Sequence, residues 1–307
     1  MWIAIRLPQL PLEIFLRGSS TPEPLAIKLK VVDDGLITPE IGAWGEYKYR
    51  LLQGYAKVFA TSMKKQWDKR VYIDLFAGSG RSKVEGTNRI VLASPLLALE
   101  IPDRFDRYIL CEKNTGKIAA LQARISANYE DVDAHFVPGD VNDRVEEVLR
   151  HLPAHGKTNK VLAFCFVDPQ SLKNLKFATI KRLSARFIDF LILIPSEMDA
   201  NRNMTRYYNR GNKTVDNFLG IPDWRPAWKD AEARGEPFWG FIINVFSKQM
   251  EKLDYLDQAS EQAELVRSTE KNLPLYRLAF FSRHKLGERF WRDVKKYANP
   301  QTSFDFQ

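Results

Sequence analysis

The sequence predicts an α/β protein with a doubly wound, mainly parallel, Rossmann-like sheet. Apolar segments with strand character alternate with helical segments from Val71 to Pro195, the pattern of a parallel sheet with helices on both faces. The first apolar segment runs directly into the small-residue turn Ala77–Gly80. After a helical, aromatic-rich stretch, strand character returns at Leu275–Phe281. We therefore expect a Rossmann-like sheet with a helical insertion before its last strands.

The composition indicates a globular chain and favours a polyanionic partner. Its 307 residues are 45% hydrophobic, enough for a full core, and its net charge is +8 at pH 7. The basic excess favours nucleic acid but does not identify it. Cys111 and Cys165 lie in apolar runs without metal-ligand spacing, so we expect reduced, buried thiols and no metal site. No apolar stretch approaches about 20 residues and Met1–Arg17 lacks a cleavage site, which predicts a cytoplasmic protein without a membrane partner.

The chain is expected to divide into four parts. Several prolines and the run Gly18-Ser19-Ser20 break any long helix near the amino end, so this part is predicted to be a loosely attached arm. The predicted parts are an N-terminal arm over residues 1–40, a Rossmann-like cofactor-binding domain over 41–204, a helical insertion lobe over 205–272, and a returning strand, helix and flexible tail over 273–307.

An amphipathic helix is predicted from Trp44 to Trp67, with apolar residues at helical spacing. The polar side is expected to carry Lys48, Lys57, Lys64 and Lys65. These lysines either form an ordinary solvated face or contact nucleic acid. In the second case, a polyanion-binding surface would comprise these lysines with Arg81, Lys83 and Arg89.

Short apolar runs rich in β-branched or aromatic residues are predicted to form the sheet, as strands buried on both faces do. These segments are Val71–Phe76, Arg107–Lys113, Ala134–Asp140, Val161–Val167, Ile188–Pro195 and Leu275–Phe281. Helices are predicted from Ser94-Pro95 with Ser94 as N-cap, at Ile118–Ile125, at Arg144–Leu152 and around Phe290 and Trp291. The segment Arg81–Ala93 is predicted to be a polar loop.

The predicted insertion lobe is rich in tryptophan and phenylalanine. Trp224 and Trp228 either form its core or stack on nucleic-acid bases, and core packing is the more frequent use. At the other end of the chain, the tail Gln301–Phe306 resembles the glutamine-plus-aromatic peptides that dock on DNA sliding clamps, although such hexamers also arise by chance.

The turn after the first predicted strand is the candidate cofactor site. Gly78 and Gly80 leave room for a ligand, but the third glycine and the Lys-Ser/Thr pair of nucleotide loops are missing. A Gly-x-Gly turn of this kind suits a nucleoside-type cofactor, of which S-adenosylmethionine is the common example, and the alternative is a plain tight turn. Asp74 and Phe76 precede the turn and belong to the candidate site.

Acidic residues at the ends of the next two strands complete the candidate cofactor site. Glu112 would bind the ribose hydroxyls, unless it is a capping or surface glutamate. Asp140, with Asn142 nearby, would either meet the adenine amino group or cap the helix that follows.

Asp168 follows the most apolar predicted strand and is the candidate catalytic residue. It would accept a hydrogen bond from the attacking nitrogen or hydroxyl of a methyl acceptor, and the alternative is that Asp168-Pro169 only turns the chain into the next helix. The predicted substrate-binding residues border the same edge of the sheet and are Arg81, Gln170, Glu197 and Asn201.

Several short motifs, in this order, resemble the bacterial three-Cys-motif partner protein family. The motifs are Trp44-Gly45, Lys48-Tyr49, Met63-Lys64, Tyr72–Gly78, Ser94–Leu96, Asp168-Pro169, Ser282–His284 and Leu286-Gly287. The resemblance implies a fold similar to class I S-adenosylmethionine-dependent methyltransferases, with S-adenosylmethionine as cofactor. It also implies a companion protein of the radical S-adenosylmethionine type that carries the three-Cys motif.

The motifs favour a methyltransferase, and two other functions remain open. Nucleic-acid amino-methyltransferases have Asp-Pro-Pro-aromatic where this chain has Asp168-Pro169-Gln170-Ser171, so the aromatic side chain that would stack a flipped base is missing, which argues against base methylation. The second hypothesis is a non-catalytic, nucleoside-binding partner protein. The third is a nucleic-acid-binding module formed by the basic helix and the lobe.

Overall fold

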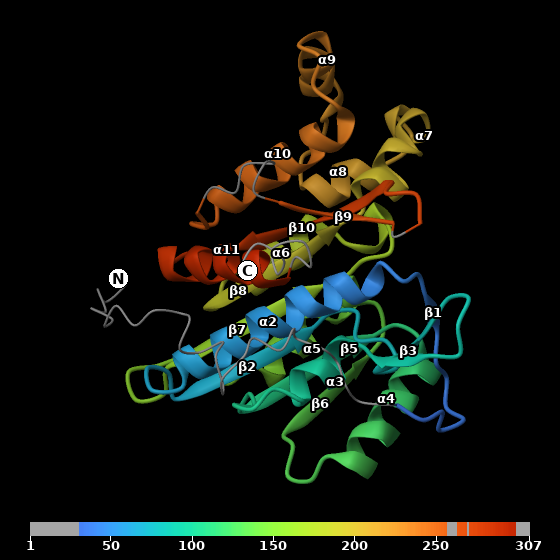
Figure 1. The fold of residues 1–307 in the computed structure, drawn as a ribbon. Coiled ribbons are helices and arrows are strands. Elements are labelled where there is room, and N and C mark those ends of the chain that lie inside the picture. Colours follow the sequence, from blue (N-terminus) through green and yellow to red (C-terminus); the bar gives the residue numbers. More distant parts are fainter. Residues whose placement is uncertain (1–30, 257–262, 269, 299–307) are drawn as a thin grey trace, which may run out of the picture.

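The computed structural model describes residues 31–256, 263–268 and 270–298. Residues 1–30 of the predicted arm and the predicted tail Gln301–Phe306 lie outside the described residues. The described chain forms a large sheet, a small sheet and helices on both sides of the large one (Figure 1).

The large sheet is mainly parallel and has seven strands. They are β2 (Lys69–Asp74), β5 (Arg107–Glu112), β6 (Ala134–Pro138), β7 (Val161–Val167), β8 (Ile188–Ile194), β9 (Glu264–Arg267) and β10 (Pro274–Phe281). Their order is β6-β5-β2-β7-β8-β10-β9. The first five of these pair in parallel, and β10 runs antiparallel to both β8 and β9.

This order confirms the predicted fold class. Counting the seven strands along the chain, the order across the sheet is 3-2-1-4-5-7-6, as in class I methyltransferase-like folds. The chain moves outward from β2 through β5 to β6 and then returns to the other side of β2 with β7. The strand order therefore reverses at β2, and a crevice forms beyond the carboxyl ends of the strands next to such a reversal.

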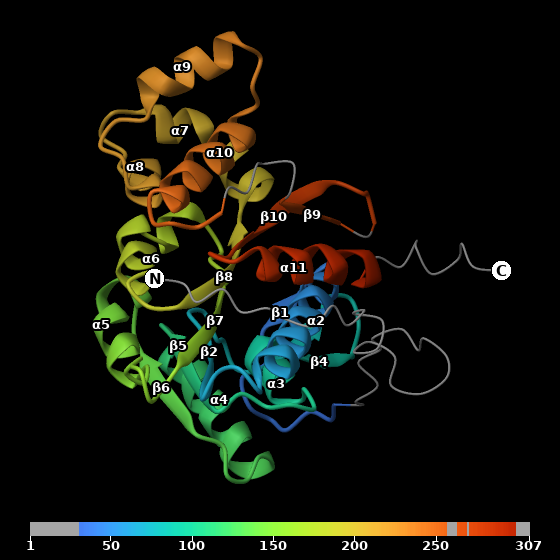
Figure 2. The same cartoon turned by 90° about the vertical axis from the view of Figure 1, so that its left-hand side faces the viewer.

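Helices cover both faces of the sheet, as Figure 2 shows most clearly. One face carries α5 (Val141–His151) and α6 (Phe177–Leu183), and their apolar side chains pack with Ile73 and Cys165. The other face carries α2 (Gly45–Met63), α3 (Ser94–Leu99), α4 (Thr115–Asn128) and α11 (Lys285–Ala298), which pack with Tyr72 and Phe164. Because β7 is covered on both faces, all its residues are buried, which explains its continuous apolar sequence.

The segment predicted to be a polar loop, Arg81–Ala93, instead contains two strands. The strands β3 (Arg81–Val84) and β4 (Ile90–Leu92) pair antiparallel, and β1 (Glu40–Ile41) joins β3 to complete the small sheet. Ser82 and Val84 are buried while Arg81 and Lys83 are half-exposed, so β3 has the alternation of a strand. Since one of the inward side chains is a serine, the alternation does not stand out in the sequence.

The predicted helical insertion is present between β8 and β9. It comprises the π-helix η2 (Ser196–Asn201), α7 (Met204–Tyr208), α8 (Thr214–Leu219), α9 (Arg225–Ala233) and α10 (Phe238–Glu251). Trp224 and Trp228 are buried against Phe238 and Phe241, so they form the core of the lobe. The short strand β9 lies within the range predicted to be helical; it is a four-residue edge strand and leaves little periodicity in the sequence.

Candidate cofactor and active site

The turn after β2 has two glycines with different surroundings. Both have positive φ, +62° at Gly78 and +82° at Gly80, which favours glycine at each. A methyl group at Gly78 would meet nothing within 4 Å, whereas one at Gly80 would lie 2.7 Å from Leu121 and 2.9 Å from Leu96. Gly78 therefore leaves open space of the kind a ligand needs, and the space at Gly80 is filled by leucines.

Asp74 lies beneath this turn and is fully buried. Its carboxylate accepts hydrogen bonds from the backbone N–H of Phe76 at 3.1 Å and from the hydroxyl of Tyr72 at 3.0 Å. Burial raises the pKa of Asp74 to about 7, against the opposing effect of hydrogen bonds from Ser94, Phe76 and Tyr72. Asp74 holds the turn in place from below, and Ser94 supports it there as the first residue of α3 rather than as its N-cap.

Glu112, at the end of β5, contacts the same turn. Its Oε2 atom accepts a hydrogen bond from the N–H of Gly78 at 2.9 Å, and its Oε1 atom accepts one from the N–H of Asn114 at 2.7 Å. A carboxylate has about four acceptor positions, so roughly two remain for other donors.

Asp140 follows β6 and caps α5. Its Oδ1 atom accepts hydrogen bonds from the backbone and side-chain N–H groups of Asn142, and its Oδ2 atom lies 3.0 Å from the ammonium of Lys113. Burial raises the pKa of Asp140, but Lys113 and Asn142 outweigh this effect and hold it below its usual value. The capping alternative is thus present in the structure, and contact with adenine stays a prediction.

Asp168 follows β7 and forms an ion pair with Lys48 of α2. The ammonium nitrogen of Lys48 lies 2.6 Å from Asp168 Oδ2, with side chains that are 8% and 20% exposed. Burial lowers the pKa of Lys48, but Asp168 and Tyr276 more than offset this, and the pKa lies above its usual value. Among the described residues, Lys48 is the one hydrogen-bond donor to this carboxylate, which leaves Oδ1 open.

The prediction that Lys48 lies on the polar face of its helix is wrong. The spacing of Lys48 to Leu51, Leu52 and Tyr55 is three, four and seven residues, which places all of them on the buried face. The spacing was visible in the sequence, but a lysine is expected to face solvent when no partner for its charge is known. Its partner is 120 residues away in the sequence.

Two tyrosines flank the Lys48–Asp168 pair. The ammonium of Lys48 lies 5.2 Å from the ring centre of Tyr49 and 5.9 Å from that of Tyr276. The hydroxyl of Tyr276 is buried and has no hydrogen-bond partner among the described residues. It is a polar group beside the candidate catalytic carboxylate, and sequence reasoning did not select it.

The predicted substrate-binding residues have different surroundings. Gln170 and Asn201 are exposed. Glu197 is mostly buried, and its carboxylate lies 3.5 Å from the guanidinium of Arg277. Arg81 lies 2.8 Å from Asp34 and donates to the carbonyl of Val32, so it binds the segment before β1.

Arg124 ties the same segment to the glycine turn. Its buried guanidinium donates to the carbonyl oxygens of Ser79 and Ile37, at 2.7 and 3.0 Å, and binds the Asp34 carboxylate. The hydrogen bond from Arg124 lowers the pKa of Asp34 to about 2. Residues 33–38 thus lie against the turn, beside the crevice.

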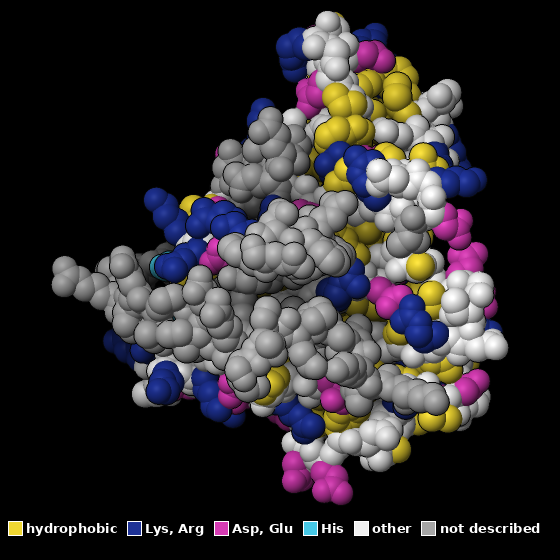
Figure 3. All heavy atoms as spheres, viewed as in Figure 1, with side chains coloured by type: hydrophobic (Ala, Val, Ile, Leu, Met, Phe, Trp, Pro, Cys, Tyr) yellow, Lys and Arg dark blue, Asp and Glu magenta, His cyan; other side chains and the backbone are white. Residues whose placement is uncertain are grey.

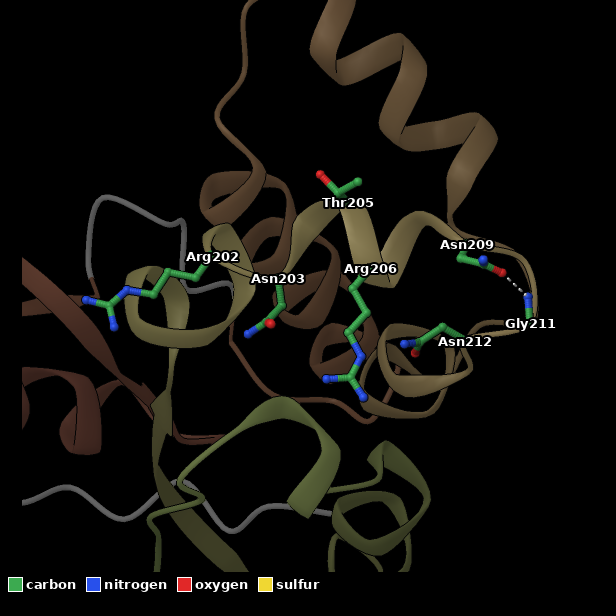
Figure 4. A pocket seen from close by; sticks show the side chains of 7 residues that line it. All are labelled: Arg202, Asn203, Thr205, Arg206, Asn209, Gly211 and Asn212. Carbon is green, nitrogen blue, oxygen red and sulfur yellow. Dashed lines mark hydrogen bonds between the residues drawn. The ribbon is translucent and has the colours of Figure 1, made fainter.

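Two surface hollows lie in the lobe, away from the glycine turn. One, of 620 Å³, is lined by polar residues between η2 and α7, of α7 and of the following loop (Figure 4). The other, of 310 Å³, lies between α9 and α10. The described chain brings no three His, Cys, Asp or Glu side chains into a metal-binding cluster, and both cysteines are free and buried. None of its helices is long and apolar enough to cross a membrane.

No protein-family model matches the sequence, and no curated protein matches it. Protein LPL1258 from Legionella pneumophila is 13% identical, with a TM-score of 0.43 over 82% of this chain and 93% of that chain. Trm1 from Pyrococcus horikoshii, in complex with S-adenosyl-L-methionine, is 10% identical, with a TM-score of 0.38 over 80% and 57%. TYW2 from M. jannaschii, in complex with AdoMet, is 12% identical, with a TM-score of 0.35 over 75% and 77%.

Proposed function

We propose that this protein is an S-adenosylmethionine-dependent methyltransferase with its active site beyond the carboxyl ends of β5, β2 and β7. One observation carries the proposal: Glu112 is the last residue of β5, and Gly78 and Asp168 follow β2 and β7, at the point where the strand order reverses. Ligands of doubly wound sheets bind at such a point.

The residues present suit the cofactor. The open space at Gly78 would admit the amino-acid end of S-adenosylmethionine beside the turn. The remaining acceptor positions of Glu112 match the two ribose hydroxyls, and Oδ2 of Asp140 would accept from the adenine amino group. Asp74, Phe76 and Gly80 would shape the turn rather than contact the cofactor, because Asp74 is buried and Gly80 is packed.

When bound, the cofactor would supply an electrophilic methyl group to a nucleophilic atom of the substrate. Asp168 would accept the hydrogen bond of that attacking group through Oδ1, which orients it and receives its proton as the new bond forms. Lys48 would hold the carboxylate in position through Oδ2. Gln170, Glu197 and Asn201 would line the substrate side, with Arg81 toward the segment before β1.

The resemblance of several motifs to the three-Cys-motif partner family extends the proposal to a companion protein. A radical S-adenosylmethionine type of protein carrying the three-Cys motif is the expected partner, and methyl transfer would then require both proteins. Co-purification of the tagged pair tests this extension independently of cofactor binding.

Titration calorimetry with S-adenosylhomocysteine tests the cofactor site. The wild type should bind, and Glu112→Ala should weaken binding by about 5- to 30-fold, because charge-assisted hydrogen bonds to ribose contribute about 1–2 kcal/mol. Glu130→Ala, which removes an exposed glutamate after α4, is the matched control and should bind as the wild type does. Absence of binding by the wild type, or equal affinity of both variants, would refute the assignment.

A further inference from the structure

We infer that the polar hollow beside α7 binds the phosphate backbone of a polynucleotide. The hollow is lined by Arg202, Asn203, Thr205, Arg206, Asn209, Gly211 and Asn212, and contains no acidic side chain. Its volume is 620 Å³. In Figure 4 the side chains of Asn203, Arg206 and Asn212 point toward the same space, while Arg202 points to the other side of the π-helix.

The hollow offers hydrogen-bond donors that the protein does not use. Arg202 and Arg206 are exposed, and among the described residues neither side chain forms an ion pair or a hydrogen bond. The amide oxygens of Asn209 and Asn212 accept from the N–H groups of Gly211 and Thr214, which orients these side chains and leaves their NH₂ groups as donors. The guanidinium of Arg206 and the two amide donors match the oxygens of phosphodiesters, and none of the residues that line the hollow is acidic.

The wall of the hollow is fixed by Arg225. This buried arginine donates to the backbone carbonyls of Tyr207, Tyr208, Asn209 and Asn212, at 2.8 to 3.0 Å, and pairs with buried Asp216 at 3.4 Å. A single side chain thus holds the loop that presents the donors. A loop ordered before binding costs less conformational entropy when a ligand arrives.

The hollow is linked to the loop that carries Asp168. Asp199 accepts a hydrogen bond from the N–H of Leu172 at 2.6 Å, and Asn203, in the wall of the hollow, donates to the same carboxylate at 2.8 Å. Leu172 is four residues beyond Asp168, so they are at most about 14 Å apart along the chain. A polynucleotide lying in the hollow would therefore reach the candidate active site.

The alternative basic surface around α2 is partly neutralised by ion pairs. Of its seven basic residues, four are in ion pairs, namely Lys48, Lys64, Arg81 and Arg89. Figure 3 shows basic side chains on the lobe as well. Because an ion-paired cation contributes less to phosphate binding than an unpaired one, the pairing weakens the surface around α2 relative to the hollow.

Fluorescence anisotropy with a labelled single-stranded RNA of about 20 nucleotides, at about 50 mM salt and without cofactor, tests the inference. Arg206→Gln should weaken binding about three- to tenfold and reduce the salt dependence by about one phosphate contact. Arg202→Gln should have a smaller effect, because the Arg202 side chain points away from the hollow. Lys229→Gln removes an exposed charge from α9 in the same lobe and should leave affinity within about twofold.

A second pair of variants distinguishes an effect of charge in the hollow from a loss of folding. Asn212→Asp keeps the oxygen that accepts from Thr214 but places a negative charge in the hollow, so it should weaken RNA binding more than Asn212→Ala does. Equal effects of the two, a loss as large in Lys229→Gln, or no RNA binding by the wild type would overturn the inference. Tighter binding of poly-glutamate than of RNA or DNA would instead indicate an acidic protein and also overturn it.

A role of the hollow in binding a substrate for methyl transfer rests on the proposed function, whereas RNA binding by the hollow does not. If both hold, Arg206→Gln should raise KM for a polynucleotide substrate and leave kcat unchanged, because the residue binds away from the reacting atoms. If the protein binds RNA through the hollow but no S-adenosylhomocysteine, the proposed function fails and the inference stands.

Discussion

Two carboxylates at the ends of adjacent strands lie in opposite electrostatic surroundings. Asp74 is buried and, within the described part of the chain, has no cationic partner; burial raises its pKa to about 7. Asp168 is partly exposed and is paired with the ammonium of Lys48. Environments that differ in this way suit the two carboxyl groups to different roles, here a structural group under the turn and a hydrogen-bond acceptor at the crevice.

The raised pKa of Asp74 predicts a pH dependence of stability. The folded pKa lies above the value of about 3.9 for free aspartate, so this group's contribution is fully present below about pH 4 and is lost as pH rises through 7. Asp74→Asn imitates the protonated acid. Its free energy of unfolding, relative to wild type, should therefore increase between about pH 5 and pH 8 in urea titrations.

The difference in free energy of unfolding between variant and wild type removes the contributions of other titrating groups. One such group is Asp189, whose pKa is raised to about 6 by burial. Asp230→Asn, on an exposed position of α9, should give a pH-independent difference. A constant difference for Asp74→Asn would show that Asp74 is ionised throughout this range.

The Lys48–Asp168 pair predicts non-additive effects on stability. Asp168→Asn leaves the buried ammonium of Lys48 without its partner and should cost about 3 kcal/mol, whereas Lys48→Met leaves a partly exposed carboxylate and should cost less. The double variant should cost less than the sum by about 1–3 kcal/mol in urea unfolding.

Lys64→Met, which removes the exposed partner of Asp103 just after α2, should change stability by at most about 1 kcal/mol. Additive effects of the Lys48 and Asp168 substitutions would contradict the pairing. Because Asp168→Asn affects stability as well as chemistry, its methyl-transfer activity should be compared with that of the double variant at a temperature where both are folded.

At the scale of elements, the turn after β2 is held from three sides. Asp74 supports it from below through the N–H of Phe76, and Glu112 of β5 binds the N–H of Gly78. Arg124 of α4 binds the carbonyl of Ser79 and joins it to residues 33–38. A turn fixed before the ligand arrives presents its backbone donors and open space without a cost in ordering.

The two glycines of the turn should respond differently to alanine. Both substitutions incur about 1–2 kcal/mol for a positive φ. Gly80→Ala should lose a further 1–3 kcal/mol, roughly, because its methyl group overlaps Leu121 and Leu96. Gly78→Ala should instead reduce S-adenosylhomocysteine affinity, because its methyl group enters the open space.

Gly86, in the turn between β3 and β4, is the control for backbone strain. Its φ is +72° and a methyl group there meets nothing within 4 Å, as at Gly78. Gly86→Ala should therefore destabilise the protein as Gly78→Ala does, measured by urea unfolding, but leave cofactor affinity unchanged. Equal affinity in the Gly78 and Gly86 variants would place the cofactor elsewhere.

At the scale of the whole molecule, one sheet separates two apolar clusters and brings distant segments to one edge. The cluster on the α5 and α6 face extends into the lobe, so the lobe is packed onto the sheet through shared core. The η2 helix of the lobe contacts the loop after β7 through Asp199. The lobe thus forms one side of the candidate active site, and its hollow lies within reach of it.

The sequence by itself determined six strands of the large sheet, the turn and the character of the lobe. Runs such as Val161–Val167 are apolar throughout because they are buried on both faces. This requirement leaves a pattern in the sequence of the strand itself. The small-residue turn after β2 is equally local, since positive φ selects glycine. The core role of Trp224 and Trp228 follows from their size.

Only the tertiary structure decided which side chains meet. The pairing of Lys48 with Asp168 and the binding of residues 33–38 by Arg124 join positions far apart in the chain. The hairpin β3–β4 and the edge strand β9 are short and have few apolar residues, so their pairing partners decide their conformation. Contacts of this kind depend on which strand ends the crossovers bring together, and no local pattern encodes that arrangement.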